Sequence, residues 1–194
     1  RTKSGGFLPI IAKIEKPQAV ANIDALIGEA DGIMIARGDL GVELPPEDVP
    51  VVQKMIIKKC NRAGKPVIIA TQMLESMINS VTPTRAEASD VANAVVDGGD
   101  ALMLSGETSV GKYPVATVQI MDRIIRAVED DADYWSNLPR DMTPPQATTA
   151  DAIALSARNI ADVIGCAAVV AYTATGSTAY RVARERPRCG VIGL

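Results

Sequence analysis

The 194-residue chain contains no histidine, and this absence removes several kinds of active site at once. Without an imidazole, the chain cannot build a Ser-His-Asp triad, a Cys-His pair or a histidine-ligated metal centre. Any metal site would have to use carboxylate and other oxygen ligands, which suit Mg²⁺ or Mn²⁺. Histidine-based catalysis within this chain is therefore excluded before any motif is considered.

Cysteine is also scarce, and its three residues, Cys60, Cys166 and Cys189, form no Cys-x-x-Cys pair. Because three cysteines cannot all pair, we expect reduced thiols, each a small buried residue, in a cytoplasmic protein.

No apolar run approaches the roughly 18 residues of a membrane span. With 20 Lys and Arg against 23 Asp and Glu, the net charge of −3 supports neither a nucleic-acid nor a membrane partner.

Four short aliphatic runs, at 8–14, 32–36, 66–70 and 101–104, are continuously hydrophobic rather than alternating. This pattern is typical of parallel strands buried on both faces. Each run is followed by apolar residues at helical spacing, which predicts helices over 17–30, 46–62, the stretch after the capping box Thr84-x-x-Glu87, and 114–133. The predicted order is therefore a strand followed by a helix, four times.

Two α/β architectures fit this order: half of a (β/α)₈ barrel, or part of a doubly wound sheet. Polar, chemically able residues follow all four predicted strands: Lys13 and Glu15; Arg37, Gly38 and Asp39; Thr71 and Gln72; Ser105, Gly106 and Glu107. In a barrel all strand ends converge on one site, whereas an open sheet collects them only at its switch point. The pattern favours the barrel. A complete barrel of eight strands needs roughly 250 residues, so this chain can supply only four of them.

A second α/β unit follows the first. We assign 1–135 to the barrel portion, the Pro-rich polar stretch 136–146 to an interdomain linker, and 147–194 to the start of a C-terminal α/β domain. Within that domain the pattern predicts a helix over 147–164, a strand over 167–172, a helix over 177–186 and a strand from 190. The chain starts without methionine and stops in mid-element, so we expect a piece of a longer polypeptide.

The strand ends carry a possible metal and phosphate site. Lys13 and Glu15 are two residues apart and so share one face of a strand. Asp39 would be a second carboxylate, and two carboxylates with water and substrate oxygens suit Mg²⁺. We expect Gly38 to form a tight turn whose N–H groups approach an anion. Arg37 is, by itself, an ordinary surface or interface cation.

Hydroxyl groups at the other strand ends complete the set. Thr71 and Ser105 are, taken alone, cap or turn residues, and Glu107 either relays a proton or caps the loop at Gly111. A lysine, two carboxylates and hydroxyls around a divalent ion match phosphoryl transfer or the stabilisation of an enolate. The residues alone do not choose between these two chemistries.

Six motifs closely resemble the pyruvate kinase family, in order and along essentially the whole chain. They span 11–15 (IAKIE), 31–41 (DGIMIARGDLG), 61–66 (NRAGKP), 70–77 (ATQMLESM), 83–87 (PTRAE) and 103–108 (MLSGET). The resemblance implies a cytoplasmic glycolytic enzyme that transfers phosphate from phosphoenolpyruvate to ADP with Mg²⁺ or Mn²⁺ and K⁺. It implies the last four units of a (β/α)₈ barrel and the start of a three-layer α/β domain.

Residue roles follow from the same resemblance. Lys13 corresponds to the lysine that stabilises the transferring phosphoryl group and the enolate oxygen, and Glu15 and Asp39 to the metal ligands. Gly38, Asp39 and Thr71 correspond to the pocket for the substrate carboxylate. Ser105 and Glu107 correspond to a pair suspected of passing the proton to the enolate.

The resemblance also implies regulation and assembly. The loop and helix start formed by Thr173, Thr175, Gly176, Ser177 and Thr178 match a site for a phosphorylated effector, because hydroxyls and a glycine at a helix N-terminus favour anions. The segment 84–87 matches a region that joins subunits in the family's homotetramers. Strands that carry the family's K⁺ ligands and much of its nucleotide grip have no counterpart here, so we expect the chain alone to be inactive.

Two other readings compete with the kinase. One is a Mg²⁺-dependent lyase or aldolase that acts through a pyruvate enolate, since related barrels place a Glu and an Asp at strand ends in the same way. Lys13 argues against it, because a lyase has no phosphoryl group to neutralise. The other reading is a non-catalytic fragment that binds metal and effector only.

Overall fold

The computed structural model describes residues 8–137 and 148–194, which fall into two compact units divided between Leu138 and Pro139. Unit 1 contains β1 (Ile11–Ile14), α1 (Pro17–Ala21), α2 (Ile23–Glu29), β2 (Gly32–Ala36), α3 (Arg37–Glu43), α4 (Asp48–Ala63), β3 (Val67–Ala70), the 3₁₀ helix η1 (Glu75–Ile78), α5 (Arg85–Val96), β4 (Ala101–Met103), α6 (Gly106–Ser109), α7 (Pro114–Glu129) and α8 (Ala132–Asn137). Unit 2 contains α9 (Thr149–Ile164), β5 (Ala168–Ala171), α10 (Ser177–Arg184) and β6 (Gly190–Gly193).

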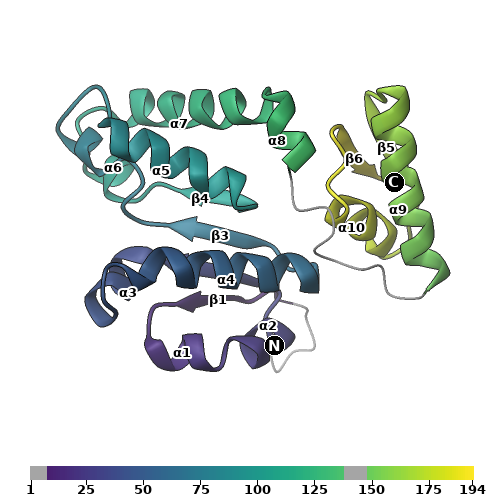
Figure 1. Cartoon of the computed structure of the whole chain (residues 1–194), viewed down its shortest axis with the longest axis horizontal. Helices are drawn as coiled ribbons and strands as arrows, with labels where there is room; N and C mark the ends of the chain where they lie inside the picture. The colour runs from purple at the N-terminus through teal and green to yellow at the C-terminus, as the bar shows by residue number, and fades with distance from the viewer. Residues whose placement is uncertain (1–7, 138–147) are drawn as a thin grey trace. The chain divides into compact units, whose positions relative to one another are not determined.

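The four strands of unit 1 form one parallel sheet in chain order, β1-β2-β3-β4. Figure 1 shows α4 crossing in front of the sheet, and α5 and α7 running side by side. The core forms where strand and helix side chains meet, and its fully buried members include Ile14, Ile33, Ile35, Ile56, Ile57, Val67, Ile69 and Val91. Burial of the middle strands on both faces explains why their sequences are continuously hydrophobic.

Each of the four predicted strands is present, but three are shorter than their apolar runs. β1 begins at Ile11, and Leu8 and Ile10 before it are exposed. β3 begins one residue after Pro66, and β4 ends before Leu104. The strands are shorter because a strand extends only as far as a neighbouring strand pairs with it, whereas apolar residues can continue beyond the last pair.

The helix predicted over 17–30 is interrupted. Asn22 lies between α1 and α2 with φ −104° and ψ 20°, and its side-chain amide donates to the carbonyl of Gln18 at 2.8 Å. Such local side-chain bonds offer the backbone an alternative to the helical pattern. The helix predicted over 46–62 begins at Asp48 and ends at Ala63, and Gly64 after it (φ 66°) is the expected left-handed stop.

The capping box before α5 is confirmed. The Thr84 hydroxyl accepts from the backbone N–H of Glu87, and the Glu87 carboxylate accepts from that of Thr84. The helix predicted over 114–133 ends earlier, at Glu129, and α8 then follows. Ser136 and Asn137, assigned to the linker from the sequence, belong to α8, and the remaining linker residues, 138–146, lie outside the described residues.

Unit 2 follows its predicted order of helix, strand, helix and strand, and β5 pairs with β6 in parallel. The second helix ends at Arg184 rather than Arg186, whose φ of 52° leaves the helical region. The buried carboxylate of Asp151 joins the two helices: it accepts from Arg181 at 2.7 Å and from Arg184 at 2.8 Å, and also from the Thr148 hydroxyl. No helix among the described residues is long and apolar enough to cross a membrane.

These contacts predict a pH-dependent stability for unit 2. Hydrogen bonds from Thr148, Arg181 and Arg184 outweigh the opposing effect of burial and lower the pKa of Asp151 from 3.8 to about 2. A depressed folded-state pKa stabilises the fold above pH 3.8, and this stabilisation disappears as the pH falls towards 2. We therefore expect Asp151→Asn to lower the hydrogen-exchange protection of α9 at pH 6, and the difference from wild type to shrink near pH 2. A difference that is constant with pH would contradict the assignment.

The cysteines differ in burial, which corrects the expectation of three core thiols. Cys60 is fully buried, whereas Cys166 and Cys189 are half-buried. Burial, assisted by Asp100, raises the pKa of the Cys60 thiol to about 12. Because the thiolate is the reactive form, we expect iodoacetamide to modify Cys166 and Cys189 in the native protein, and Cys60 only after unfolding in urea. Mass spectrometry of the alkylated peptides checks this, and equal rates at all three would refute it.

Candidate active site

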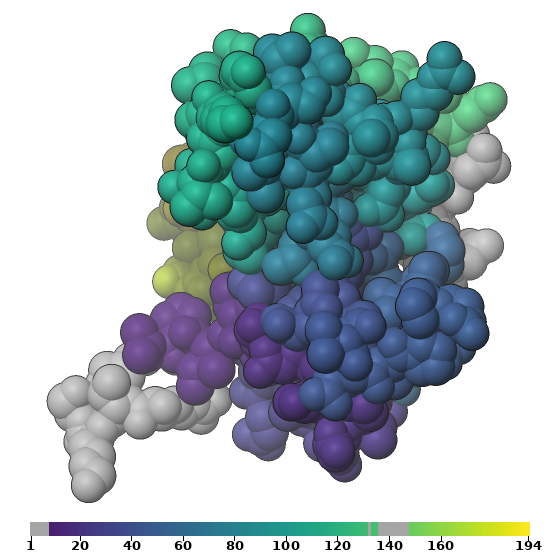
Figure 2. Space-filling view, turned by 90° about the vertical axis from the view of Figure 1, so that its left-hand side faces the viewer, coloured from purple at the N-terminus to yellow at the C-terminus, as the bar shows by residue number. Residues whose placement is uncertain are grey.

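The predicted site residues of unit 1 lie at the carboxyl edge of its parallel sheet. Glu15 follows β1, α3 follows β2, Thr71 follows β3, and Ser105 lies two residues after β4. The arrows of β1 and β3 in Figure 1 point to the same side of the molecule. Figure 2 views that side and shows the first described residues of unit 1 (purple), the region of α3 and α4 (blue) and the region that follows β3 (teal) meeting on one surface.

Lys13, Glu15 and Asp39 form one charged cluster on this edge. The ammonium Nζ of Lys13 lies 2.6 Å from Oε2 of Glu15 and 2.9 Å from Oδ2 of Asp39. These two carboxylates, Glu15 first, raise the pKa of Lys13 above its usual range, so the side chain is a permanent cation at neutral pH. All three side chains are about half exposed, which leaves the cluster open to a ligand from solvent.

The cluster also fits a divalent cation. Glu15 and Asp39 come from different β/α units but turn their carboxylates to the same space beside Lys13. Mg²⁺ commonly takes only one or two protein carboxylates and completes its shell with water and substrate oxygens. In the described part of the chain, no group of three or more His, Cys, Asp and Glu side chains could hold a metal. Two carboxylates open to solvent are therefore the donor set that this edge offers.

Gly38 does not form the expected tight turn; it lies in the first turn of α3. Its backbone N–H donates to Oγ1 of Thr71 at 2.7 Å, and the Thr71 hydroxyl donates in turn to the carbonyl of Ala70 at 2.6 Å. A Cβ on residue 38 would stand 3.1 Å from Oγ1 of Thr71. Gly38 thus allows a close approach between α3 and the end of β3. Gly38 and Thr71, both expected in the carboxylate pocket, are therefore adjacent.

The backbone after β3 is strained. Thr71 (φ 69°) and Gln72 (φ 54°) are consecutive non-glycine residues in the left-handed region, and Thr71 is also β-branched. Each such residue costs about 1–3 kcal/mol and persists only where its surroundings hold it. This conformation carries the Thr71 hydroxyl to Gly38.

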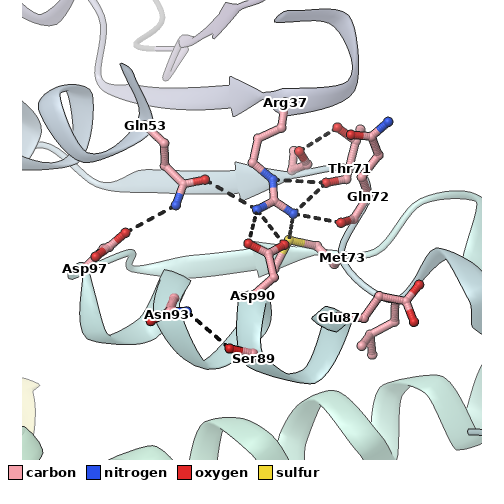
Figure 3. A network of polar contacts seen from close by, with 12 residues as sticks. Arg37, Gln53, Thr71, Gln72, Met73, Glu87, Ser89, Asp90, Asn93 and Asp97 are labelled. Carbon is pink, nitrogen blue, oxygen red and sulfur yellow. Dashed lines mark hydrogen bonds and ion pairs between the residues drawn. The ribbon is translucent and has the colours of Figure 1, made fainter. Parts of the chain in front are cut away.

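Arg37 holds this strained pair, as Figure 3 shows. Its guanidinium donates to the carbonyl of Thr71 from Nε (3.2 Å) and Nη2 (3.0 Å), and to the carbonyl of Gln72 from Nη2 at 2.8 Å. Nη1 lies 2.7 Å from Oδ2 of Asp90 on α5. Arg37 is only 7% exposed, so its interpretation as a surface cation is wrong. The sequence placed Arg37 after the second strand but did not reveal its role, and it gave no sign of Asp90, since no local pattern marks a contact across 53 residues.

Glu107 fixes the next part of the same segment. It is buried, and its carboxylate accepts from the backbone N–H of Leu74 at 3.2 Å and of Ser105 at 2.8 Å. These bonds join the segment after β3 to the segment after β4. They do not place the carboxylate on the Gly111 loop, which was the structural alternative to a proton relay.

Glu87 anchors the far end of the segment. Besides closing the capping box, its carboxylate accepts from the backbone N–H and the hydroxyl of Ser76, at 2.7 Å and 2.5 Å. Burial works against its charged form, but the bonds from Ser76 and Thr84 outweigh burial and lower its pKa. Residues 71–76 are therefore held by three charged side chains from three different helices.

The candidate effector residues lie together in unit 2, around the start of α10. Gly176 has φ 81°, and the Thr175 hydroxyl donates to that of Ser177 at 3.1 Å. Ser177 and Thr178 open the helix, and the backbone N–H of Thr173 donates to the carbonyl of Leu194. An effector at this loop stays a prediction.

These features define a class: an α/β-barrel protein whose strand ends present a lysine and two carboxylates, an arrangement suited to an anionic substrate with a divalent metal. Within that class, the chain belongs to the pyruvate kinase family. Residues 2–118 match the family model for the pyruvate kinase barrel domain, and residues 151–194 match the model for the pyruvate kinase alpha/beta domain. The barrel, rather than the doubly wound sheet, is thereby confirmed, and the segments after all four strands lie within the first match.

Curated relatives named pyruvate kinase are identical to this chain at about half of the aligned positions. Identity is 53% over 191 residues with the protein of Methylorubrum extorquens AM1, covering 98% of this chain and 40% of the relative. It is 54% over 183 residues with that of Mycobacterium tuberculosis H37Rv, covering 93% and 37%. A crystal structure of a pyruvate kinase from Cryptosporidium parvum matches with a TM-score of 0.89 and 47% identity, over 95% of this chain and 38% of that one. The chain thus spans about 40% of the length of these relatives.

The contact between Gly38 and Thr71 predicts opposite outcomes for two glycines of α3. Alanine in place of a helical glycine stabilises by about 0.5–1 kcal/mol where space allows. A Cβ on Gly41 would have nothing within 4 Å, so we expect Gly41→Ala to raise the free energy of unfolding of unit 1. Gly38→Ala gives no such gain, because two hydrogen bonds fix the Thr71 hydroxyl in its way. Urea unfolding followed by Trp135 fluorescence checks this, and equal stabilisation by both changes would contradict it.

Proposed function

We propose that the protein carrying this sequence transfers the phosphoryl group of phosphoenolpyruvate to ADP, giving pyruvate and ATP, and that Lys13 is its principal catalytic cation. The observation that supports this is the Lys13 ammonium beside Glu15 and Asp39, 2.6 and 2.9 Å from their oxygens, at the carboxyl edge of the sheet. Membership of the pyruvate kinase family supplies the substrates.

Lys13 has the charge that the reaction needs. In the transfer, an oxygen of the ADP β-phosphate bonds to phosphorus while the bond from phosphorus to the enol oxygen breaks, leaving an enolate. The loose transition state spreads negative charge over the phosphoryl oxygens, so catalysis is mostly positioning and neutralisation. An ammonium that stays protonated and half exposed can meet both the phosphoryl group and the enolate oxygen.

Glu15 and Asp39 would hold Mg²⁺ or Mn²⁺. The bound ion supplies positive charge against the phosphate and enolate oxygens. The two carboxylates also keep the Lys13 ammonium at the same place, so the residues of this chain orient the positive charge before substrate arrives. K⁺ stays a prediction that rests on the family resemblance.

Gly38, Asp39 and Thr71 would receive the substrate carboxylate. The Gly38 N–H and the Thr71 hydroxyl bond to each other in this structure, so a bound carboxylate would compete with that bond and make use of donors that are already aligned. Asp39 lies in the same first turn of α3, where backbone N–H groups lack helical acceptors. The pocket thus joins α3 to the end of β3.

Ser105 and Glu107 would serve the final proton transfer, in which the enolate carbon gains a proton and becomes the methyl group of pyruvate. In this proposal Ser105 supplies the hydroxyl and Glu107 holds the Ser105 backbone, which the bond of 2.8 Å from the Ser105 N–H to the Glu107 carboxylate supports. Glu107 is then a positioning residue, since its carboxylate is occupied by two backbone N–H groups.

The remaining family properties stay predictions. A homotetramer joined through residues 84–87 and a phosphorylated effector at 173–178 rest on the resemblance. In support of the effector, the left-handed Gly176 turns the chain directly into α10, so that the hydroxyls of Thr175 and Ser177 lie side by side.

Replacement of Lys13 tests the proposal. In the full-length protein that carries this sequence, we expect Lys13→Met to lower turnover by several orders of magnitude and to leave phosphoenolpyruvate binding nearly unchanged, because the charge acts mainly in the transition state. A coupled ADP-to-pyruvate assay measures it. Lys16→Met is the matched control, since Lys16 is equally exposed and also carries an ion pair, with Glu43. Activity of Lys13→Met within tenfold of wild type would remove Lys13 from the mechanism.

The same reagents separate the competing functions. Phosphoenolpyruvate and Mn²⁺ are titrated with and without ADP, and the products are identified. ATP and pyruvate support the kinase, carbon–carbon cleavage of a pyruvate-derived substrate supports the lyase or aldolase, and Mn²⁺-dependent binding without turnover supports a binding fragment. Glu15→Gln should abolish Mn²⁺ binding in every case.

A further inference from the structure

We propose that Asp90 is a positioning residue for the candidate substrate pocket: through Arg37 it keeps the Thr71–Gln72 backbone in its left-handed conformation. This inference rests on the proposed function at one point: it takes Thr71 to contact the substrate. Asp90 lies on α5, a different element from every residue of the charged cluster and the carboxylate pocket.

The strained pair needs an external hold, and Arg37 is placed to give it. The left-handed carbonyls of Thr71 and Gln72 both accept from its guanidinium, at 3.0 Å and 2.8 Å from Nη2. The sulfur of Met73 also receives Nη2, so one nitrogen meets three consecutive residues. A small change in the direction of this side chain would release all three.

Asp90 sets that direction. Both of its carboxylate oxygens lie close to Nη1 of Arg37, at 2.8 and 2.7 Å, and a carboxylate beside a buried guanidinium compensates its charge. Gln53 also contacts Nη1, at 3.4 Å, but an amide carries no charge. Figure 3 shows Asp90 and the two carbonyls on different sides of the guanidinium, which is thereby held between α5 and the segment after β3.

A route for rearrangement lies beside this pair. Arg37, Gln72 and Asp90 all line a pocket of about 200 Å³. Without the Asp90 charge, a guanidinium that is 7% exposed lacks compensation, and the pocket offers it a path towards water. Movement in that direction takes the donors away from Thr71 and Gln72. The Thr71 hydroxyl would then lose its alignment with Gly38, 2.7 Å away.

The experiment compares Asp90→Asn with Asp24→Asn, which removes another interhelical ion pair, with Lys59, away from the site. Hydrogen–deuterium exchange of the peptide covering 71–76 is the first readout and needs no activity. We expect faster exchange there in Asp90→Asn, in a protein that stays folded with a lower melting temperature, and no change in the exchange of this peptide in Asp24→Asn. Unchanged exchange in Asp90→Asn, or loss of the whole fold in both Asp90→Asn and Asp90→Glu, would overturn the proposal.

Kinetics supply the second readout. Loss of one charge-assisted contact should raise KM for phosphoenolpyruvate about tenfold while kcat and the Mn²⁺ affinity change little. Because Asp90 acts through Arg37, adding Asp90→Asn to Arg37→Lys should cause no further rise in KM, and a full additive effect would refute that route. If the wild-type full-length protein that carries this sequence shows no turnover, the proposed function fails, whereas the exchange result still decides the role of Asp90.

Discussion

The hydrogen bonds from the Arg37 guanidinium to the carbonyls of Thr71 and Gln72 hold the candidate site together. Two consecutive residues with left-handed φ angles are costly, and neither Thr71 nor Gln72 is a residue type that adopts this region readily. Arg37 offsets that cost by donating to both carbonyls at once, and Asp90 compensates its charge in turn. The close approach of Gly38 and Thr71 follows from this arrangement, and the alignment of α3 with the end of β3 follows from that approach.

The backbone of residues 71–76 is held by charged side chains in addition to apolar burial. Arg37 holds its first residues, Glu107 holds Leu74, and Glu87 holds Ser76. Arg37 and Glu107 are nearly fully buried, so removal of either side chain would leave buried polar groups unsatisfied. Three helices, α3, α6 and α5, thereby fix the position of one hydroxyl beside the sheet edge.

The charged cluster beside this loop follows a different rule. Lys13, Glu15 and Asp39 remain about half exposed, so their mutual attraction is screened and contributes little to stability. Their arrangement makes sense as preparation for a ligand: positive charge is held in place, and carboxylates face solvent where a cation can reach them. The buried contacts around Arg37 and the open, charged cluster thus meet at the Gly38–Thr71 hydrogen bond.

Features under local chemical control could be predicted from the amino-acid sequence. Continuous aliphatic runs gave the order of strands, Thr84 and Glu87 marked the start of α5, and the motifs identified the family. Three features could not be predicted in this way and depend on packing: Arg37 is buried, Gly38 lies in a helix, and the backbone of Thr71 is left-handed. The two groups of features differ in the sequence separation of the residues involved. Periodicity and capping act within a few residues, whereas Arg37 bonds to Thr71, 34 residues away, and to Asp90, 53 residues away. A local pattern cannot contain such contacts, because packing brings their partners together.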